Sequence, residues 1–196
     1  MNLTRKIHCL DEAVCDEIVQ ALEATEFKPS AILRKGSNPK EDIRTSSSSV
    51  LNKYHQDIVH DALNASLTAW STQIKNEYPE IQACLNLPGV TLNLQTYHET
   101  ISVLRYKPGQ KYDWHTDAPI TQCGSQKVDP RKRLISCVLY LNHNFVGGET
   151  EMLGRKYRPE KGKVLIFPSN WNYPHRACPV TEGTKYAVVT WYHPDD

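Results

Sequence analysis

A β-rich fold is indicated most strongly by the segment RLISCVLYLNHNFVGGETEM, residues 133–152. Its first part, residues 133–141, is rich in Ile, Val, Leu and Tyr, which favour strands, and Gly147-Gly148 marks a turn. The other strand-like runs and the turn residues between them are residues 91–106, 163–167 and 185–192, and Pro108-Gly109, Gly162 and Pro168. The chain beyond Gly89 is therefore predicted to consist of short strands joined by turns.

The first half of the chain is predicted to be mainly helical. Residues 11–25 carry apolar side chains at steps of three and four, and Asp11 is suited to cap this helix. A second helix is predicted over residues 55–78, and its buried stripe consists of Val59, Leu63, Leu67, Trp70, Ile74 and Tyr78. Residues 36–50 hold Gly, Pro and a serine run, which predicts a loop. Helices followed by strands predict an α+β fold, mainly β, with helices packed outside a closed antiparallel double sheet.

Length and composition describe one ordinary globular domain. The 196 residues fit a single domain, with helical support over about residues 1–88 and a β core over about residues 89–196. Hydrophobic residues make up 39% and charged residues 23%, which argues against intrinsic disorder. The formal net charge of +1 argues against nucleic acid as a partner. No run reaches the roughly 18 apolar residues of a membrane helix, so no membrane partner is expected.

The N-terminus and the cysteines predict a cytoplasmic protein. The opening residues, MNLTRKIHCLDEAVCDE, lack the apolar core of a signal peptide. The cysteines form no CxxC pair, so free thiols in a reducing compartment are favoured over disulfides. The six are Cys9, Cys15, Cys84, Cys123, Cys137 and Cys178.

A candidate metal site begins with His115 and Asp117, at the end of the strand-like segment YDWHTD. Alternation along an extended chain places both side chains on one face, so they can bind the same ion. An HxD pair alone is weak, and a third ligand must come from elsewhere. His175, in SNWNYPHRACPV, is the best candidate, and His143, in the predicted turn LNHNF, is its main competitor. Two histidines and one carboxylate form the ligand set of non-haem Fe(II) oxygenases, and they leave positions open for a co-substrate and dioxygen.

Lys185 is a candidate partner for an anionic co-substrate. It lies ten residues after His175, at the start of the strand-like run KYAVVTWYH. A cation buried beside the metal would pair with a carboxylate. The alternative is a lysine at a strand end with its ammonium group in water.

The combined motifs RYKPGQKYDWHTDA, RLISCVLYLNHNFVGGETEM, GKVLIFPSN and YPHRACPVTEGTKYAVVTWYH resemble the iron- and 2-oxoglutarate-dependent dioxygenases of the prolyl 4-hydroxylase type. They span residues 105–192, nearly half of the chain. The Cys-Asp pair of the first helix and Ile43-Arg44-Thr45-Ser46 also look like the upstream region of that family. The resemblance implies a double-stranded β-helix, or jelly roll, flanked by N-terminal helices.

The resemblance also implies roles for individual residues. Fe(II) would be held by His115, Asp117 and His175. Lys185 would pair with the distal carboxylate of 2-oxoglutarate, where relatives use Lys or Arg. Tyr106 would lie where a family tyrosine reaches the co-substrate, and Tyr140 would bind the distal carboxylate beside Lys185. Both tyrosines have the alternative of being ordinary core residues, and strand packing is favoured for Thr190 and Trp191.

The expected activity is hydroxylation of an unactivated C–H bond, in prolyl residues of a peptide or protein, with decarboxylation of 2-oxoglutarate to succinate. Fe(II), 2-oxoglutarate and dioxygen would be required, and ascorbate is a further candidate cofactor. Asp117 favours hydroxylation, because related halogenases carry a small residue there.

The alternatives are a hydroxylase of a free amino acid or small molecule and a non-catalytic jelly-roll binding module. The segments 36–50 and 118–132 are expected to face the substrate, with Arg131 and Arg133 nearby or in an exposed basic turn.

Overall fold

The computed structural model of the protein describes residues 1–30, 43–81, 99–118 and 133–193. Helices α1 (Glu12–Glu23) and α2 (Lys53–Glu77) lie within these described residues. The longer strands are β1 (Arg5–His8), β3 (Ser47–Val50), β4 (Ser102–Tyr106), β5 (Tyr112–His115), β6 (Ile135–Tyr140), β10 (Lys163–Pro168) and β13 (Lys185–Tyr192). The shorter strands are β2 (Lys28–Pro29), β7 (Val146–Gly147), β8 (Thr150–Met152), β9 (Arg155–Tyr157), β11 (His175–Ala177) and β12 (Val180–Glu182).

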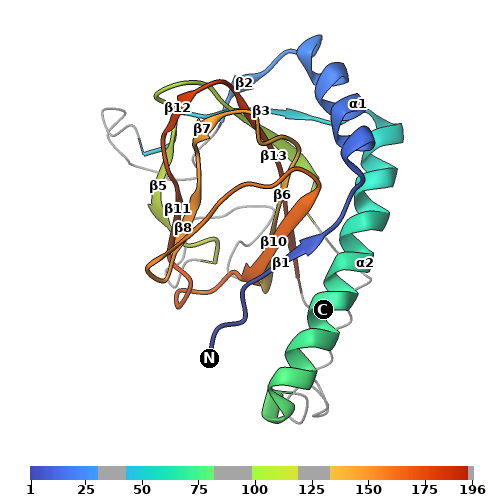
Figure 1. The fold of residues 1–196 in the computed structure, drawn as a ribbon, viewed down its shortest axis with the longest axis vertical. Helices are drawn as coiled ribbons and strands as arrows, with labels where there is room; N and C mark the ends of the chain where they lie inside the picture. The colour runs from blue at the N-terminus through green and yellow to red at the C-terminus, as the bar shows by residue number, and fades with distance from the viewer. Residues whose placement is uncertain (31–42, 82–98, 119–132, 194–196) are drawn as a thin grey trace, which may run out of the picture.

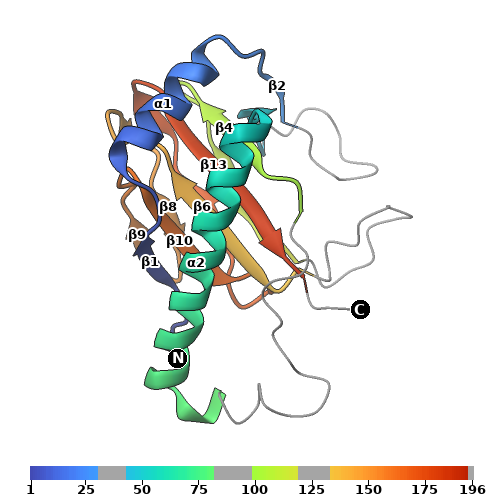
Figure 2. The same cartoon turned by 90° about the vertical axis from the view of Figure 1, so that its right-hand side faces the viewer.

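The strands form antiparallel sheets that curl around a common interior. A seven-stranded sheet has the order β1-β10-β6-β13-β4-β3-β2, and a four-stranded sheet has the order β5-β11-β8-β9. Strands β7 and β12 form a separate pair. Figure 1 shows the two larger sheets on opposite sides of the interior, with both helices outside the seven-stranded sheet. Figure 2 shows α1 and α2 lying across the outer face of that sheet. The predicted jelly roll with flanking helices is therefore confirmed.

The seven-stranded sheet is covered on both faces, which explains why its strands are apolar runs. In β10, Val164 and Ile166 pack with the helices, whereas Leu165 and Phe167 pack in the interior between the sheets. A strand that is buried on both faces needs apolar side chains at every position rather than at alternate ones. The strand-like runs of the sequence are these doubly buried strands.

Both predicted helices are present. α1 follows Asp11, which occupies the N-cap position as expected. α2 begins two residues earlier than predicted because the side chain of Asn52 accepts a hydrogen bond from the backbone N–H of His55. This capping contact satisfies one of the free N–H groups of the first turn. The predicted stripe of α2 is buried from Val59 to Ile74, and Tyr78 packs against the same cluster.

The loop predicted over residues 36–50 is wrong at its C-terminal end. Ser47–Val50 forms β3, which pairs with β4 on one side and with β2 on the other. Serine has little intrinsic preference for strands, so the backbone partners supplied by β4 decide the conformation here. The first part of the segment, residues 36–42, lies outside the described residues, as do residues 91–98 and 119–132 of other predicted segments.

Two further expectations concern cysteines and membrane spans. The cysteines within the described ranges carry free thiols, and these are Cys9, Cys15, Cys137 and Cys178. Cys84 and Cys123 lie outside those ranges. No helix in the described part of the chain combines the length and apolar character needed to cross a membrane.

Candidate active site

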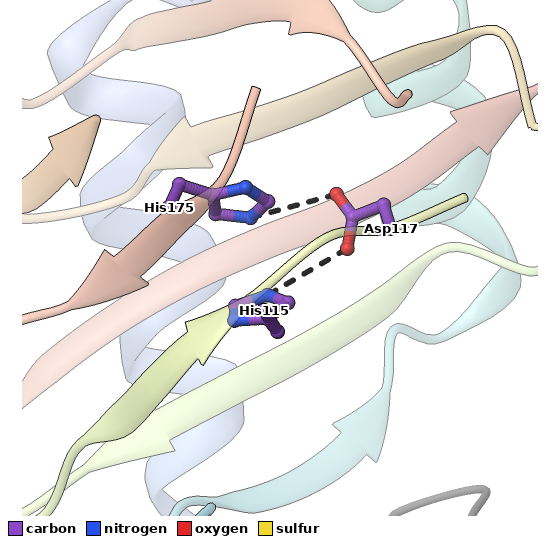
Figure 3. A group of neighbouring side chains, drawn as sticks. All are labelled: His115, Asp117 and His175. Atoms are coloured by element: carbon purple, nitrogen blue, oxygen red, sulfur yellow. Dashed lines mark ion pairs between the residues drawn. The ribbon is translucent and has the colours of Figure 1, made fainter. Parts of the chain in front are cut away.

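The three expected metal ligands converge in the interior, between neighbouring strands. β5 and β11 are antiparallel partners, and their register places His115 opposite His175. The Nε2 atom of His115 lies 3.7 Å from Oδ1 of Asp117, and Nε2 of His175 lies 3.6 Å from Oδ2. Figure 3 shows both imidazole rings turned toward the carboxylate. All three ligand atoms lie within 4.8 Å of one another, a group of side chains that can hold one ion.

Asp117 reaches this group by a different route from the one predicted. β5 ends at His115, so alternation along one strand does not explain the shared position of the two side chains. Asp117 lies in a turn, and the next residue, Ala118, donates its backbone N–H to the carbonyl of Ser169 at 2.8 Å. The hydroxyl of Ser136 then donates to Oδ2 of Asp117 at 2.7 Å. The carboxylate is therefore held by a turn and by β6.

Backbone carbonyl groups set the tautomer of both histidines. Nδ1 of His115 lies 2.8 Å from the carbonyl oxygen of Asp113, and Nδ1 of His175 lies 3.1 Å from that of Tyr173. A carbonyl oxygen only accepts hydrogen bonds, so each Nδ1 must carry the proton. In its neutral form, each ring then presents the lone pair of Nε2 toward Asp117. This is the orientation that a metal-binding histidine requires.

Burial and charge keep His115 and Asp117 in the protonation states that a metal needs. Desolvation, with a contribution from His175, holds the pKa of His115 well below its ordinary value. Burial alone would raise the pKa of Asp117, but the neighbouring histidines and the Ser136 hydroxyl together lower it. His115 is therefore neutral and Asp117 ionised near pH 7.

A β-bulge places a tyrosine against one of the ligands. Tyr112 pairs with Ala177 and His115 pairs with His175, so β5 has two intervening residues where β11 has one. The extra residue brings Tyr112 and His115 to the same face, where their rings stack with centroids 3.6 Å apart. The guanidinium of Arg44 lies 4.8 Å from the Tyr112 ring centroid. The sequence pattern did not indicate Tyr112, because strict alternation places residues three apart on opposite faces.

Lys185 is buried in the interior rather than at the surface. Its side chain is only 2% exposed, and Nζ donates a hydrogen bond to the carbonyl of Gly148 at 2.6 Å. Desolvation lowers the pKa of Lys185 to about 8. Within the described residues the ammonium group forms no ion pair with a carboxylate. The alternative of a solvent-exposed strand-end lysine is therefore wrong.

The two expected tyrosines lie on either side of Lys185. The Nζ atom of Lys185 is 5.2 Å from the ring centroid of Tyr106 and 5.3 Å from that of Tyr140. Tyr106 is also the partner of Lys185 in the β4–β13 register. The hydroxyl of Tyr140 lies 2.8 Å from that of Thr150, a motif residue to which the sequence analysis assigned no role.

Gly147 of the predicted turn is the last residue of β7, and Gly148, which follows it, supplies the carbonyl that Lys185 contacts. Both residues have positive φ angles, 77° and 66°. A Cβ atom at Gly147 would lie 2.3 Å from the carbonyl oxygen of Pro179, so only glycine fits there.

Arg133 joins the candidate site through Asp117. It donates to the backbone carbonyl of Asp117 at 3.3 Å and forms two hydrogen bonds with Glu99, at 2.5 and 2.6 Å. Its guanidinium lies 3.8 Å from the centroid of the Trp191 ring. The interpretation of Arg133 as part of an exposed basic turn is therefore wrong, whereas Arg131 lies outside the described residues.

His143 does not belong to the cluster. It is exposed and accepts a hydrogen bond from the backbone N–H of Lys161 at 3.3 Å.

The side chains present fit the groups that the sequence implies. Two imidazole nitrogens and one carboxylate oxygen suit Fe(II) and leave part of its coordination sphere open. A buried ammonium group without a carboxylate partner among the described residues suits a dicarboxylate such as 2-oxoglutarate, because a buried cation is costly unless it is paired.

Comparison with known proteins identifies relatives for most of the chain. Residues 101–193 match the family described as the 2OG-Fe(II) oxygenase superfamily. The chain is 26% identical to the Arabidopsis thaliana protein named "Probable prolyl 4-hydroxylase 6", over 94% of this chain and 66% of that protein. It thus spans less than two thirds of the length of this relative.

Solved structures of prolyl hydroxylases share the fold. A Trichoplax adhaerens prolyl hydroxylase, in complex with a peptide fragment of the hypoxia inducible factor oxygen degradation domain, aligns with a TM-score of 0.69 at 20% identity. That alignment covers 99% of this chain and 84% of the Trichoplax chain. A viral collagen prolyl hydroxylase from Paramecium Bursaria Chlorella virus-1, in its 2OG complex, aligns with a TM-score of 0.64 at 22% identity. This second alignment covers 96% of this chain and 94% of the viral chain.

Proposed function

The β-rich part of this chain, residues 101–193, belongs to the 2OG-Fe(II) oxygenase superfamily, and from this we propose that the protein hydroxylates prolyl residues of a peptide or protein. The reaction would use Fe(II), 2-oxoglutarate and dioxygen and would release succinate and carbon dioxide. Ascorbate would support turnover as a reductant.

The observation that carries the proposal is the joint presence of a metal-binding group and a buried lysine without a carboxylate partner among the described residues. His115, Asp117 and His175 present their ligand atoms to one point. Lys185 presents an ammonium group in the same interior. A protein that only binds a ligand has no need of both features, because a buried ammonium group destabilises the fold when it is left unpaired.

In the proposed mechanism the protein holds and orients the reacting groups. His115, Asp117 and His175 would hold Fe(II), with both Nδ1 protons donated to backbone carbonyls so that the rings cannot rotate. Ser136 would keep the Asp117 carboxylate aimed at the metal through its 2.7 Å hydrogen bond. When bound, Fe(II) and 2-oxoglutarate together supply the activation of dioxygen that replaces a C–H hydrogen by hydroxyl.

Lys185 would bind the distal carboxylate of 2-oxoglutarate. Its ammonium has donated one hydrogen bond to Gly148, so two N–H groups remain for a carboxylate. The neighbouring hydroxyls of Tyr140 and Thr150 would add further hydrogen bonds. The buried position of this group excludes water and strengthens the charge-assisted contact.

A peptide substrate is supported by the relatives. Proteins named as prolyl 4-hydroxylases match this chain at 26% identity over 94% of its length. The structurally similar Trichoplax enzyme is complexed with a peptide fragment. Proline-containing peptides are therefore the first substrates to test.

The direct test is product formation by the purified protein. The protein is incubated with Fe(II), 2-oxoglutarate, ascorbate and an array of proline-containing peptides. We expect succinate to form and one peptide class to gain the mass of a single oxygen atom, as measured by mass spectrometry. Succinate formation only with free proline or another small molecule would refute the peptide substrate. No succinate with any substrate would refute the proposed activity.

A further inference from the structure

The bulge in β5 consists of Asp113 and Trp114, which together lie opposite the single residue Arg176 of β11. Trp114 directly precedes one expected metal ligand in the sequence, and Arg176 directly follows another. Bulges next to active sites redirect side chains that regular pairing would place elsewhere. The shape of this bulge therefore determines where His115 points.

The bulge also fixes the tautomer of His115. The backbone carbonyl of Asp113 accepts the Nδ1–H of His115 at 2.8 Å. The side chain of Asp113 accepts the backbone N–H of Trp114 at 2.9 Å, which satisfies a donor inside the irregular part of the ladder. A change in the bulge would move the Asp113 carbonyl and break its hydrogen bond with Nδ1 of His115. The proton could then move to Nε2, the nitrogen that faces Asp117.

Arg176 contacts the bulge from the outer face of the four-stranded sheet. Its guanidinium lies 5.0 Å from the centroid of the Trp114 ring. Nε and Nη2 donate to Oε2 of Glu151, the partner of Arg176 on β8, at 3.0 and 2.8 Å. Arg176 thus connects Glu151 of β8 to Trp114 of the bulge.

We propose that Arg176 is a positioning residue, which holds the β5 bulge in the shape that aims Nε2 of His115 at the metal. This inference rests on the proposed function, because it assumes that His115 is a metal ligand. The Arg176 and Glu151 side chains are 36% and 19% exposed, and ion pairs that are partly open to solvent contribute little to stability. The effect of Arg176 is therefore expected in the geometry of the site rather than in folding.

The first test compares metal affinity in matched variants. Arg176→Gln removes the charge and the paired donors, whereas Arg155→Gln makes the same substitution in β9 of the same sheet. The Arg155 side chain is exposed and contacts no partner in the described ranges, so it serves as the control. We expect the dissociation constant for Mn(II) to rise about tenfold or more in Arg176→Gln. Arg155→Gln is expected to match the wild type, and Arg176→Lys is expected to be intermediate.

The second test needs no metal. Nitrogen NMR of the imidazole rings reports which nitrogen carries the proton. In the metal-free wild type, His115 and His175 are both expected to carry it on Nδ1. In Arg176→Gln, and in Trp114→Leu, His115 is expected to be a mixture of rings protonated on Nδ1 and rings protonated on Nε2. His175 donates to the carbonyl of Tyr173 and should keep its proton on Nδ1.

The outcomes separate this inference from the proposed function. An unchanged Mn(II) dissociation constant together with an unchanged His115 tautomer in Arg176→Gln would overturn the role of Arg176. A wild-type protein that binds no Mn(II) would instead refute the proposed metal site, and the tautomer comparison would still decide whether Arg176 controls the bulge. Equal thermal unfolding midpoints of Arg176→Gln and Arg155→Gln would support an effect on geometry.

Discussion

The two faces of the seven-stranded sheet are built from alternate residues of the same strands, yet their chemistry differs. On the face toward the helices, β6 and β13 contribute Cys137, Leu139 and Val188 to an apolar cluster. On the interior face, the same strands contribute Tyr140 and Lys185 beside the candidate active site. A one-residue shift of either strand would exchange the two sets.

Successive side chains of a strand point to opposite faces, so the residues that stabilise the fold and those suited to chemistry lie on different faces of this sheet. The helix-covered face buries apolar side chains, which stabilises the fold. The interior face buries the Lys185 ammonium group, which destabilises the metal-free fold unless a ligand pairs with it. Substitutions on the helix-covered face should therefore lower stability, and substitutions in the interior should lower activity.

The largest effect is expected from the interior variant His175→Ala. Loss of one of three ligands should abolish succinate formation, because the remaining pair cannot hold the metal firmly. Anaerobic addition of Fe(II) and 2-oxoglutarate should give a charge-transfer absorption band in the wild type and none in the variant. His143→Ala is the matched control, since this exposed histidine lies outside the cluster. Equal bands in His175→Ala and the wild type would exclude His175 as a ligand.

The next largest effect is expected from Lys185→Met, which replaces the buried ammonium by an apolar group of similar length. Breaking a buried charge pair costs about 3 kcal/mol, so the KM for 2-oxoglutarate should rise about 100-fold. The metal-free protein should become more stable to urea, because an unpaired buried cation is removed. Lys185→Arg keeps the charge and should retain most of the affinity. A variant with wild-type KM would show that Lys185 does not contact the co-substrate.

The opposite behaviour is expected from Leu139→Ala on the helix-covered face. Leu139 is fully buried in the cluster beneath α1 and α2. Removing a buried leucine side chain costs about 2–5 kcal/mol of unfolding free energy, which urea denaturation measures. The KM for 2-oxoglutarate and the turnover per folded molecule should stay at wild-type values. A large loss of turnover in the folded variant would show that the two faces are not independent.

The sequence predicts the helix-covered face better than the interior. Apolar periodicity identified both helices, and continuous apolar runs identified the doubly buried strands, because burial of apolar surface dominates there. The motifs named His115, Asp117, His175 and Lys185, since metal and carboxylate binding restrict the residue types.

The contacts that alternation alone could not predict depend on irregular backbone. The stacking of Tyr112 on His115 follows from a bulge, and Asp117 reaches the site from a turn after β5. Ser47–Val50 is a strand because β4 pairs with it, and pairing between distant segments leaves no local signal in a serine run.

The smallest effect, and the most specific for the interior face, is a pH dependence with opposite signs in stability and co-substrate binding. Desolvation lowers the pKa of Lys185 from 10.5 to about 8. Between these values the folded protein releases this proton while the unfolded chain retains it, so the unfolded state binds more protons and stability rises with pH. From pH 8 to 9.5 the gain is about 2 kcal/mol. The KM for 2-oxoglutarate should rise above pH 8, by up to about tenfold per pH unit, because the carboxylate requires the ammonium form.

Urea denaturation and KM measurements at pH 7 and pH 9.5 test both signs, and Lys185→Met should lack both trends. If the unfolding free energies of the wild type and Lys185→Met change in parallel with pH, this lysine stays protonated in the metal-free fold. Any destabilising contribution of the interior face would then have to come from other groups.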